Sequence, residues 1–332
     1  MSGKNFIEKV AIVGAGGQVG TFITQALLKT GRHQITALSR QGSKNIIPEG
    51  ATIKHINYAE PSTLVEALRG QDALIYTLSV LATDEADRLI KAAAEAEVPW
   101  ILPNEFGYNS DNDEVNKDTL SGLSKKAQRK LIEELEKSSW VGLASGYWYE
   151  YSLSVGAWSF GFDIKGKEVT FYDEGDVKIH TSTWPQVGRA VANLLSLPIT
   201  SDDATATSLS QLKNKFAFIS SFYVSQQDIF ASLLHVTGTT RDDWKISSQP
   251  SAARFALGKQ MLQNGDRRGF GLALYARTFF LDGAGTHPDS ANAALDIPEK
   301  ENLDEYTSVA IQMATENYFE TKVIARITPG AS

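Results

Sequence analysis

The chain has 332 residues, of which 42% are hydrophobic and 21% charged, and 39 acidic residues outnumber 32 basic ones for a net charge of −7. This composition is typical of a globular protein with a sizeable core, and the acidic balance disfavours general binding to nucleic acid or anionic membranes. Because the chain has no cysteine, disulfides, thiolate nucleophiles and cysteine-ligated zinc are excluded.

The N-terminus lacks an apolar signal region, and no apolar run is long enough to cross a bilayer, so we expect no membrane segment and a cytoplasmic location. The five histidines are scattered without metal-ligand spacing, which predicts no metal site. The length suggests two domains, or one domain with a large insertion.

A glycine-rich turn follows the first predicted strand, residues 9–13. The next helix has one apolar face, and glycines at its start let backbone N–H groups approach a pyrophosphate. The spacing is G-x-x-G-x-x-G with one additional glycine. We expect the residues of this turn to bind a dinucleotide: Gly14, Gly16, Gly17, Gln18, Val19 and Gly20.

The second predicted strand, residues 34–39, is followed by Arg40 and Lys44, and the first acidic residue after it is Glu49. An acidic residue at this place binds the ribose hydroxyls of NAD, whereas a basic one accommodates the 2′-phosphate of NADP. The sequence therefore predicts NADP(H) as the cofactor, held in part by Arg40 and Lys44.

Strands and helices alternate through the first half of the chain. Further strands are predicted at 52–56, 72–79, 100–102 and 141–144, and helices at 61–68, 84–97 and 119–137. This alternation is typical of an α/β, Rossmann-type, doubly wound parallel sheet with right-handed crossovers. Ligands of such sheets lie beyond the carboxyl ends of the strands. Further cofactor contacts are therefore expected from residues after the fourth and fifth strands: Thr77, Leu78, Ser79, Asn104 and Phe106.

Residues 109–118 form an acidic stretch that we interpret as a solvated loop. In the helix that follows, the spacing predicts a core face of Leu120, Leu123, Ala127 and Leu131. A solvated stripe is predicted for Lys126, Arg129, Lys130 and Glu133. Lys125 lies on a flank with Ser121 and Ile132, where it can border the cofactor crevice.

Beyond residue 150 the pattern changes. Strands are predicted at 168–172, 178–181 and 216–219, and helices at 184–195, 225–236, 251–264, 269–281 and 303–320. We interpret 1–150 as an NADP-binding Rossmann domain and 151–332 as a smaller, mostly helical, substrate-binding lobe, with parts of 180–235 returning to the first domain.

Aromatic residues gather just past the sixth strand, where a substrate would meet the nicotinamide. For any single one of them core packing is the alternative interpretation. Together they favour a flat, apolar substrate over a sugar or phosphate. The predicted substrate contacts are Tyr147, Trp148 and Tyr149.

Four motifs, in this order and spacing, resemble the isoflavone reductase-like and NmrA-like group of atypical short-chain dehydrogenase/reductases. They are the glycine turn, Arg40, the segment Pro103-Asn-Glu-Phe-Gly107, and Lys125 with Arg129-Lys130-Leu-Ile-Glu133. The resemblance covers the first 150 residues. Two departures stand out. Asn104 replaces the serine of the family's P-S-E-F-G segment, and Ser121 stands where ordinary short-chain dehydrogenases have a tyrosine four residues before the lysine.

The resemblance implies an NADPH-dependent reductase of an aromatic, phenolic-like small molecule, with Lys125 as the general acid or base. A non-catalytic, NADP(H)-sensing regulator that binds a protein partner is the alternative, because NmrA-like regulators keep the nucleotide fold. A non-redox use of the nucleotide, such as isomerisation, also stays open, as does a homodimer.

Overall fold

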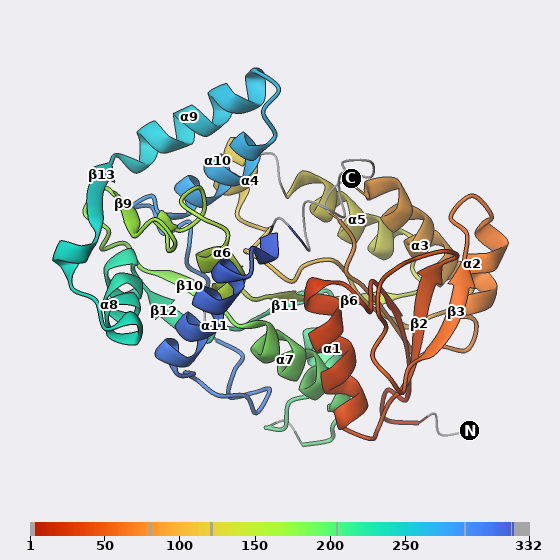
Figure 1. Ribbon diagram of the computed structural model, residues 1–332. Helices are drawn as coiled ribbons and strands as arrows, with labels where there is room; N and C mark the ends of the chain where they lie inside the picture. Colours follow the sequence, from red (N-terminus) through yellow and green to blue (C-terminus); the bar gives the residue numbers. More distant parts are fainter. Residues whose placement is uncertain are drawn as a thin grey trace.

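The computed structural model describes residues 4–79, 82–119, 122–203, 205–288, 290–319 and 321. Within these residues the central element is a seven-stranded parallel sheet with the order β11-β6-β5-β4-β1-β2-β3 (Figure 1). Its strands are β1 (Lys9–Val13), β2 (Gln34–Arg40), β3 (Thr52–Ile56), β4 (Ala73–Tyr76), β5 (Trp100–Leu102), β6 (Ser139–Ala144) and β11 (Lys215–Phe218). The predicted α/β, Rossmann-type, doubly wound sheet is confirmed.

Side chains of β1 alternate between the two faces of the sheet, because successive residues of a strand point in opposite directions. Val10 and Ile12 join the core beneath α1 (Gln18–Lys29) and α7 (Trp184–Ser196). Ala11 and Val13 join the core on the other face, which α2 (Pro61–Leu68), α3 (Thr83–Glu95) and α5 (Leu123–Glu134) cover. Strand order reverses between β1 and β4, so the ligand crevice of this fold opens beside the glycine turn.

The chain leaves the sheet after β6 and returns to it with α7 and β11. Helix α7 begins at a regular cap, in which the Thr183 side chain accepts a hydrogen bond from the Gln186 N–H. It packs on α1, and β11 pairs with β6 in parallel register, from Lys215 opposite Val141 to Phe218 opposite Ala144.

The rest of the second half forms a lobe with its own aromatic core (left in Figure 1). One three-stranded sheet holds β7 (Tyr147–Trp148), β10 (Ile179–Ser182) and β12 (Phe222–Val224), and another holds β8 (Phe162–Asp163), β9 (Glu168–Tyr172) and β13 (Lys245–Gln249). The helices are α6 (Tyr149–Ser154), α8 (Gln226–Thr237), α9 (Ser251–Gln263), α10 (Arg268–Thr278) and α11 (Leu303–Thr315). The pattern of the sequence did not indicate β7, β8, β12 and β13, because they are short or, in the case of β13, exposed along their length.

The interpretation of 109–118 as a solvated loop was wrong for its second part. Residues Asp113–Thr119 form a short helix, α4, whose Val115 and Asn116 are buried. The Asn112 side chain accepts a hydrogen bond from the Val115 N–H at 3.1 Å, and two acidic residues occupy the first turn. A cap and acidic residues at a helix start are both stabilising, so the charges that looked like a loop instead favour a helix.

None of the helices in the described part of the chain combines the length and the apolar character that a membrane crossing needs.

Candidate active site

The glycine turn joins β1 to α1 at close quarters. Gly14 has a φ of 83°, a left-handed conformation that glycine adopts without strain, and its carbonyl accepts the Gly17 N–H at 2.8 Å. A Cβ on Gly20 would collide with the Gly14 carbonyl and lie 2.9 Å from the Thr77 Oγ1. Helix α1 starts directly after Gly17, so the N–H groups of its first turn have no partner within the helix. This is the geometry of an anion site for a pyrophosphate.

Other residues expected at the cofactor surround this turn. The Thr77 hydroxyl donates to the Gly14 carbonyl at 3.2 Å, which ties the end of β4 to the turn. A Cβ on Gly16 would lie 2.5 Å from the Ile46 carbonyl, so the loop after β2 crosses directly over Gly16. The Gln18 Nε2 is buried and meets no hydrogen-bond partner among the described residues. Val19 packs in the core, which leaves only its backbone for a ligand.

Arg40 and Lys44 lie at the carboxyl end of β2, next to the strand that carries the glycine turn. Both side chains are exposed. Neither forms an ion pair with another described residue, so both cations are available to a phosphate.

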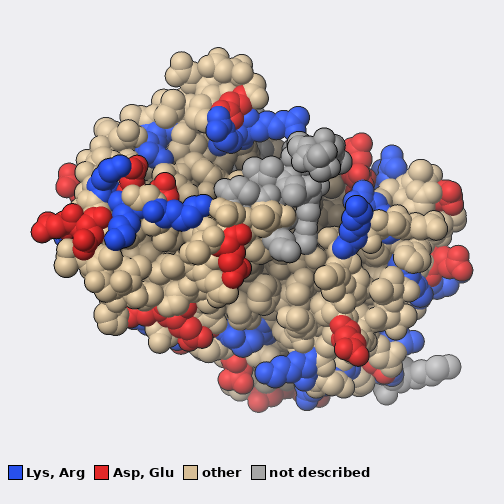
Figure 2. All heavy atoms as spheres, in the orientation of Figure 1, with Lys and Arg blue, Asp and Glu red and all other residues tan. Residues whose placement is uncertain are grey.

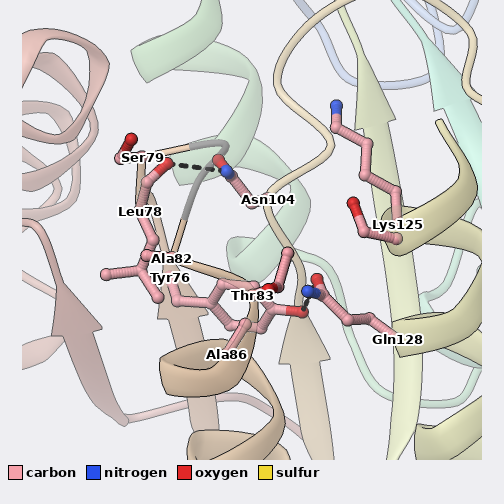
Figure 3. A pocket seen from close by; sticks show the side chains of 10 residues that line it. Tyr76, Leu78, Ser79, Ala82, Thr83, Ala86, Asn104, Lys125 and Gln128 are labelled. Atoms are coloured by element: carbon pink, nitrogen blue, oxygen red, sulfur yellow. Dashed lines mark hydrogen bonds between the residues drawn. The ribbon is translucent and has the colours of Figure 1, made fainter. Parts of the chain in front are cut away.

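A second hollow lies on the other side of the β4 end, between α3 and α5 (Figure 3). Its cavity volume is about 20 Å³, which is room for about one water molecule, and it opens to solvent. The Asn104 amide, at the end of β5, donates to the Leu78 carbonyl at 2.7 Å, and the Tyr76 hydroxyl donates to the Gln128 Oε1 at 3.3 Å. Burial raises the pKa of Tyr76 well above its ordinary value, so this phenol stays neutral. The pocket is lined by Tyr76, Leu78, Ser79, Ala82, Thr83, Ala86, Asn104, Ser124, Lys125 and Gln128.

Lys125 and Lys126 differ in exposure, as their positions on the helix predicted. The Lys125 side chain is 14% exposed, borders the pocket, and holds its Nζ 3.5 Å from the Glu105 Oε2 and 5.4 Å from the centre of the Tyr108 ring. The Lys126 side chain is 54% exposed and pairs with Asp113 at 3.0 Å.

The predicted faces of this helix were wrong in another respect. Leu123 is 53% exposed, whereas Gln128, Arg129 and Ile132 are buried. Arg129 enters the interior because it forms ion pairs with Glu105 and Asp111, and its guanidinium lies 4.8 Å from the centre of the Phe216 ring. Leu120 and Ser121, two other residues of the predicted faces, fall outside the described residues.

The predicted substrate aromatics do not line this pocket. Tyr147 is half-buried, with its hydroxyl accepting from the Thr278 Oγ1 at 2.6 Å, and burial raises its pKa. The Trp148 indole donates to the Phe106 carbonyl at 2.8 Å. Tyr149 is fully buried in the core of the second lobe, where its ring packs on Phe222, so its predicted contact with substrate is not supported. The Phe106 side chain is also buried in the core, so only its backbone could contact a cofactor.

Sequence reasoning missed several residues of the site: Tyr76, Thr83, Glu105, Ser124 and Gln128. For two of them a signal was present. Glu105 lies inside the Pro103–Gly107 motif, and Gln128 follows Lys125 by three residues, which places both on one helix face. No group of three or more histidine or acidic side chains suited to a metal ion occurs within the described ranges.

Comparison with known proteins agrees with this architecture. Residues 7–155 match the model of the NmrA-like family. The chain is 28% identical over 306 residues to the oxidoreductase aprR of Aspergillus flavus, a match that covers 90% of this chain and 96% of that protein. It is 31% identical over 138 residues to a phenylcoumaran benzylic ether reductase of Nicotiana tabacum, but spans only 44% of that relative's length.

Two solved structures share the fold over nearly their whole length. An isoflavone reductase superposes with a TM-score of 0.69 at 22% identity and covers 92% of this chain and 99% of its own. Leucoanthocyanidin reductase of Vitis vinifera, in a binary complex with NADPH, gives a TM-score of 0.70 at 17% identity with the same coverage. The predicted resemblance to the isoflavone reductase-like and NmrA-like group is confirmed, and the relatives named oxidoreductase or reductase agree with an oxidoreductase. The match to the NmrA-like family model covers the first half of the chain, and the likeness to isoflavone reductase shows the same fold.

Proposed function

We propose that this protein is an NADPH-dependent reductase of an aromatic, phenolic-like small molecule, with Lys125 as its general acid or base. The observation that carries the proposal is the position of Lys125. Its mostly buried ammonium borders a pocket formed at the ends of β4 and β5, next to the glycine turn. NADPH supplies a hydride when bound at such a strand edge.

Nucleotide binding is supported by groups of this chain. The first turn of α1 presents N–H groups to a pyrophosphate. Arg40 and Lys44, which pair with no carboxylate among the described residues, lie at the place where a 2′-phosphate distinguishes NADP from NAD. The NADPH complex of leucoanthocyanidin reductase, a protein with the same fold, agrees with this assignment.

Lys125 can serve the acceptor side of the reaction. When a hydride adds to carbon, negative charge develops on the substrate, and a nearby ammonium stabilises that charge or gives it a proton. The proposed substrate class is taken from the relatives, one of which is named a phenylcoumaran benzylic ether reductase. The cytoplasmic location and a homodimer stay predictions.

The first experiment is a fluorescence titration of the wild type and Arg40→Ala with NADPH and with NADH. Loss of a charge-assisted contact to phosphate weakens binding by about 1.5–3 kcal/mol, so Arg40→Ala is expected to lower NADPH affinity by roughly tenfold or more and leave NADH affinity unchanged. The control is Arg32→Ala, an exposed arginine before the amino end of β2. Equal affinity of the wild type for both nucleotides would contradict the NADP(H) assignment.

Lys125→Ala then separates a catalyst from a non-catalytic regulator. For an enzyme, NADPH oxidation in the presence of an aromatic enone or a phenolic ether falls by about a hundredfold or more while NADPH still binds. A regulator shows no turnover in the wild type and no change in the variant.

A further inference from the structure

The carboxylate of Glu105 is buried between two cations. Its side chain is 1% exposed, and its backbone lies in a tight turn, where the Gly107 N–H donates to the Glu105 carbonyl at 2.8 Å. A carboxylate in this setting needs hydrogen bonds and opposite charge to offset its lost hydration. The neighbours of Glu105 supply both.

Arg129 and Ser110 immobilise the carboxylate. Arg129 forms an ion pair with Oε1, and the Ser110 hydroxyl donates to Oε2 at 2.7 Å. The same Arg129 Nη1 donates to the Ser110 oxygen at 2.7 Å, which closes a ring of contacts. Asp111 pairs with the other end of the guanidinium. Arg129 is itself enclosed by the rings of Phe216 and Trp140.

Lys125 lies on the remaining side of Glu105. Its Nζ is 3.5 Å from Oε2, longer than the 2.7–2.9 Å or so of a direct charge-assisted hydrogen bond. The carboxylate therefore attracts the ammonium without using its donors fully, and within the described residues N–H groups of Lys125 remain for a ligand in the pocket. Arg129 is shared between Glu105 and Asp111, so the ammonium of Lys125 brings the charge of these four side chains to zero.

We propose that Glu105 is the positioning residue of Lys125, a role that rests on the proposed function. Glu105, fixed by Arg129 and Ser110, holds the Lys125 ammonium at the pocket. NADPH, when bound, would supply a hydride from its nicotinamide C4–H bond and become NADP⁺, and the Lys125 Nζ gives its proton to the atom of the acceptor on which charge develops. Glu105 takes no proton, and solvent reprotonates Lys125.

Competitive labelling tests the proposal without any substrate. Lysines are acetylated with a trace of acetic anhydride across a pH series, and the label on each is measured by mass spectrometry. A lysine amine that a carboxylate holds reacts slowly, so removal of that carboxylate in Glu105→Gln is expected to raise the label on Lys125 several-fold across the series, which displaces its labelling curve. Asp111, Arg129, Tyr108 and Tyr76 are the other titratable groups around this pair or in the pocket, and all are left in place.

Lys126, the residue after Lys125, offers a matched control because it also faces a carboxylate. Asp113→Asn removes the carboxylate that faces Lys126 at 3.0 Å in an exposed pair, and it should leave the Lys125 curve where it is. An unchanged Lys125 curve in Glu105→Gln overturns the proposal. Should Glu105→Gln fail to fold, Glu105→Asp is the second variant. It keeps the negative charge but moves it away from Lys125 by the length of one methylene, so a smaller displacement of the Lys125 labelling curve in the same direction is expected. No shift there overturns the proposal equally.

Turnover gives the second readout. With NADPH and 4-phenyl-3-buten-2-one as the probe, Glu105→Gln is expected to lower kcat at least tenfold with KM changed less than twofold. A purely structural role predicts instead that activity falls in proportion to the folded fraction, with the Lys125 curve unmoved, and this would overturn the proposal. Failure of the wild type to bind NADPH contradicts the proposed function alone, because the labelling curve does not depend on it.

Discussion

Gly20 is the residue at which α1 comes closest to the glycine turn. A Cβ there would collide with the Gly14 carbonyl and lie 2.9 Å from the Thr77 Oγ1, so Gly20→Ala has to displace either the helix or the turn. Overpacking of this kind costs about 1–3 kcal/mol, and the displaced N–H groups would no longer converge on one anion. We expect Gly20→Ala to lower the free energy of unfolding in urea by that amount and to weaken NADPH binding at least tenfold.

The control for this substitution is Gly107→Ala, because a Cβ on Gly107 meets no atom within 4 Å among the described residues. Its stability and NADPH affinity should match the wild type. Wild-type affinity in Gly20→Ala would show that the nucleotide does not use the start of α1.

Single residues of the site could be predicted from the sequence where the pattern that indicates them lies within one short segment. The glycine turn could be interpreted from spacing, and Lys125 was separated from Lys126 by helix geometry. The burial of Glu105 against Arg129 could not be found in this way, although Glu105 lies in a motif. Its burial depends on Arg129, which comes from a different element, and no periodicity of either segment shows that their charges meet.

Two elements show how charge pattern and structure diverge. The acidic residues of α4 were interpreted as a loop, yet the Asn112 cap makes them the first turn of a helix. In α5 the leucine spacing predicted a core face, but the buried face contains Arg129 because an ion pair and two aromatic rings receive it. The strands of the parallel sheet were predictable, since continuous apolar runs leave little choice between faces.

Glu150, on α6, caps the start of α7 and makes the contact between these elements depend on pH. Its Oε1 accepts the Trp184 N–H at 2.8 Å, its Oε2 has no partner within the described residues, and burial raises its pKa to about 7. Between pH 4.5, its ordinary pKa, and 7 the folded chain keeps a proton that the unfolded chain has lost. The protonated Glu150 therefore favours the folded chain. Its contribution to the free energy of unfolding is complete below pH 4.5 and is lost as pH rises from 4.5 to 7, by about 3 kcal/mol.

Glu150→Gln keeps an oxygen for the Trp184 N–H and removes the ionisation. We expect its free energy of unfolding in urea to decline less than that of the wild type between about pH 5 and 7.5. Glu133→Gln is the matched control, because Glu133 also accepts a tryptophan N–H, from Trp140, but is exposed. The assignment fails if Glu150→Gln and the wild type have the same pH slope.

In the whole molecule, aromatic side chains join the second lobe to the sheet domain. Trp184, at the start of α7, stacks on Phe22 of α1 with ring centres 5.5 Å apart and contacts Trp148 and Tyr151 at 5.9 Å each. Charged side chains cluster mainly toward the edges of the face in Figure 2. The sequence predicted the sheet and its returning strand but not this junction, because contacts between distant rings leave no periodic pattern. The division at residue 150 stays a proposal.

A stacked pair of histidines joins β10 to the segment between α10 and α11 and should set the tolerance of the fold to acid. The rings of His180, on β10, and His287 lie 4.0 Å apart, and the His287 N–H donates to the His180 Nδ1 at 3.3 Å. Burial lowers the pKa of both, that of His180 to about 4 from 6.5, and the two rings also repel each other's charge. Between pH 6.5 and 4 the unfolded chain therefore binds a proton at His180 that the folded chain does not bind. The contribution of His180 to the free energy of unfolding is complete above pH 6.5 and is lost as pH falls toward 4.

His180→Phe keeps a ring in the stack and removes its titration, and His55→Phe, at an exposed position on β3, is the control. We expect the midpoint of urea unfolding to fall between about pH 6.5 and 5 less steeply in His180→Phe than in the wild type or the control. The measurement belongs in a Glu150→Gln background, because Glu150 acts in the opposite direction across most of the same window. Equal slopes for His180→Phe and His55→Phe in that background would place the acid sensitivity elsewhere, with His33, whose pKa burial also lowers, as the next residue to replace.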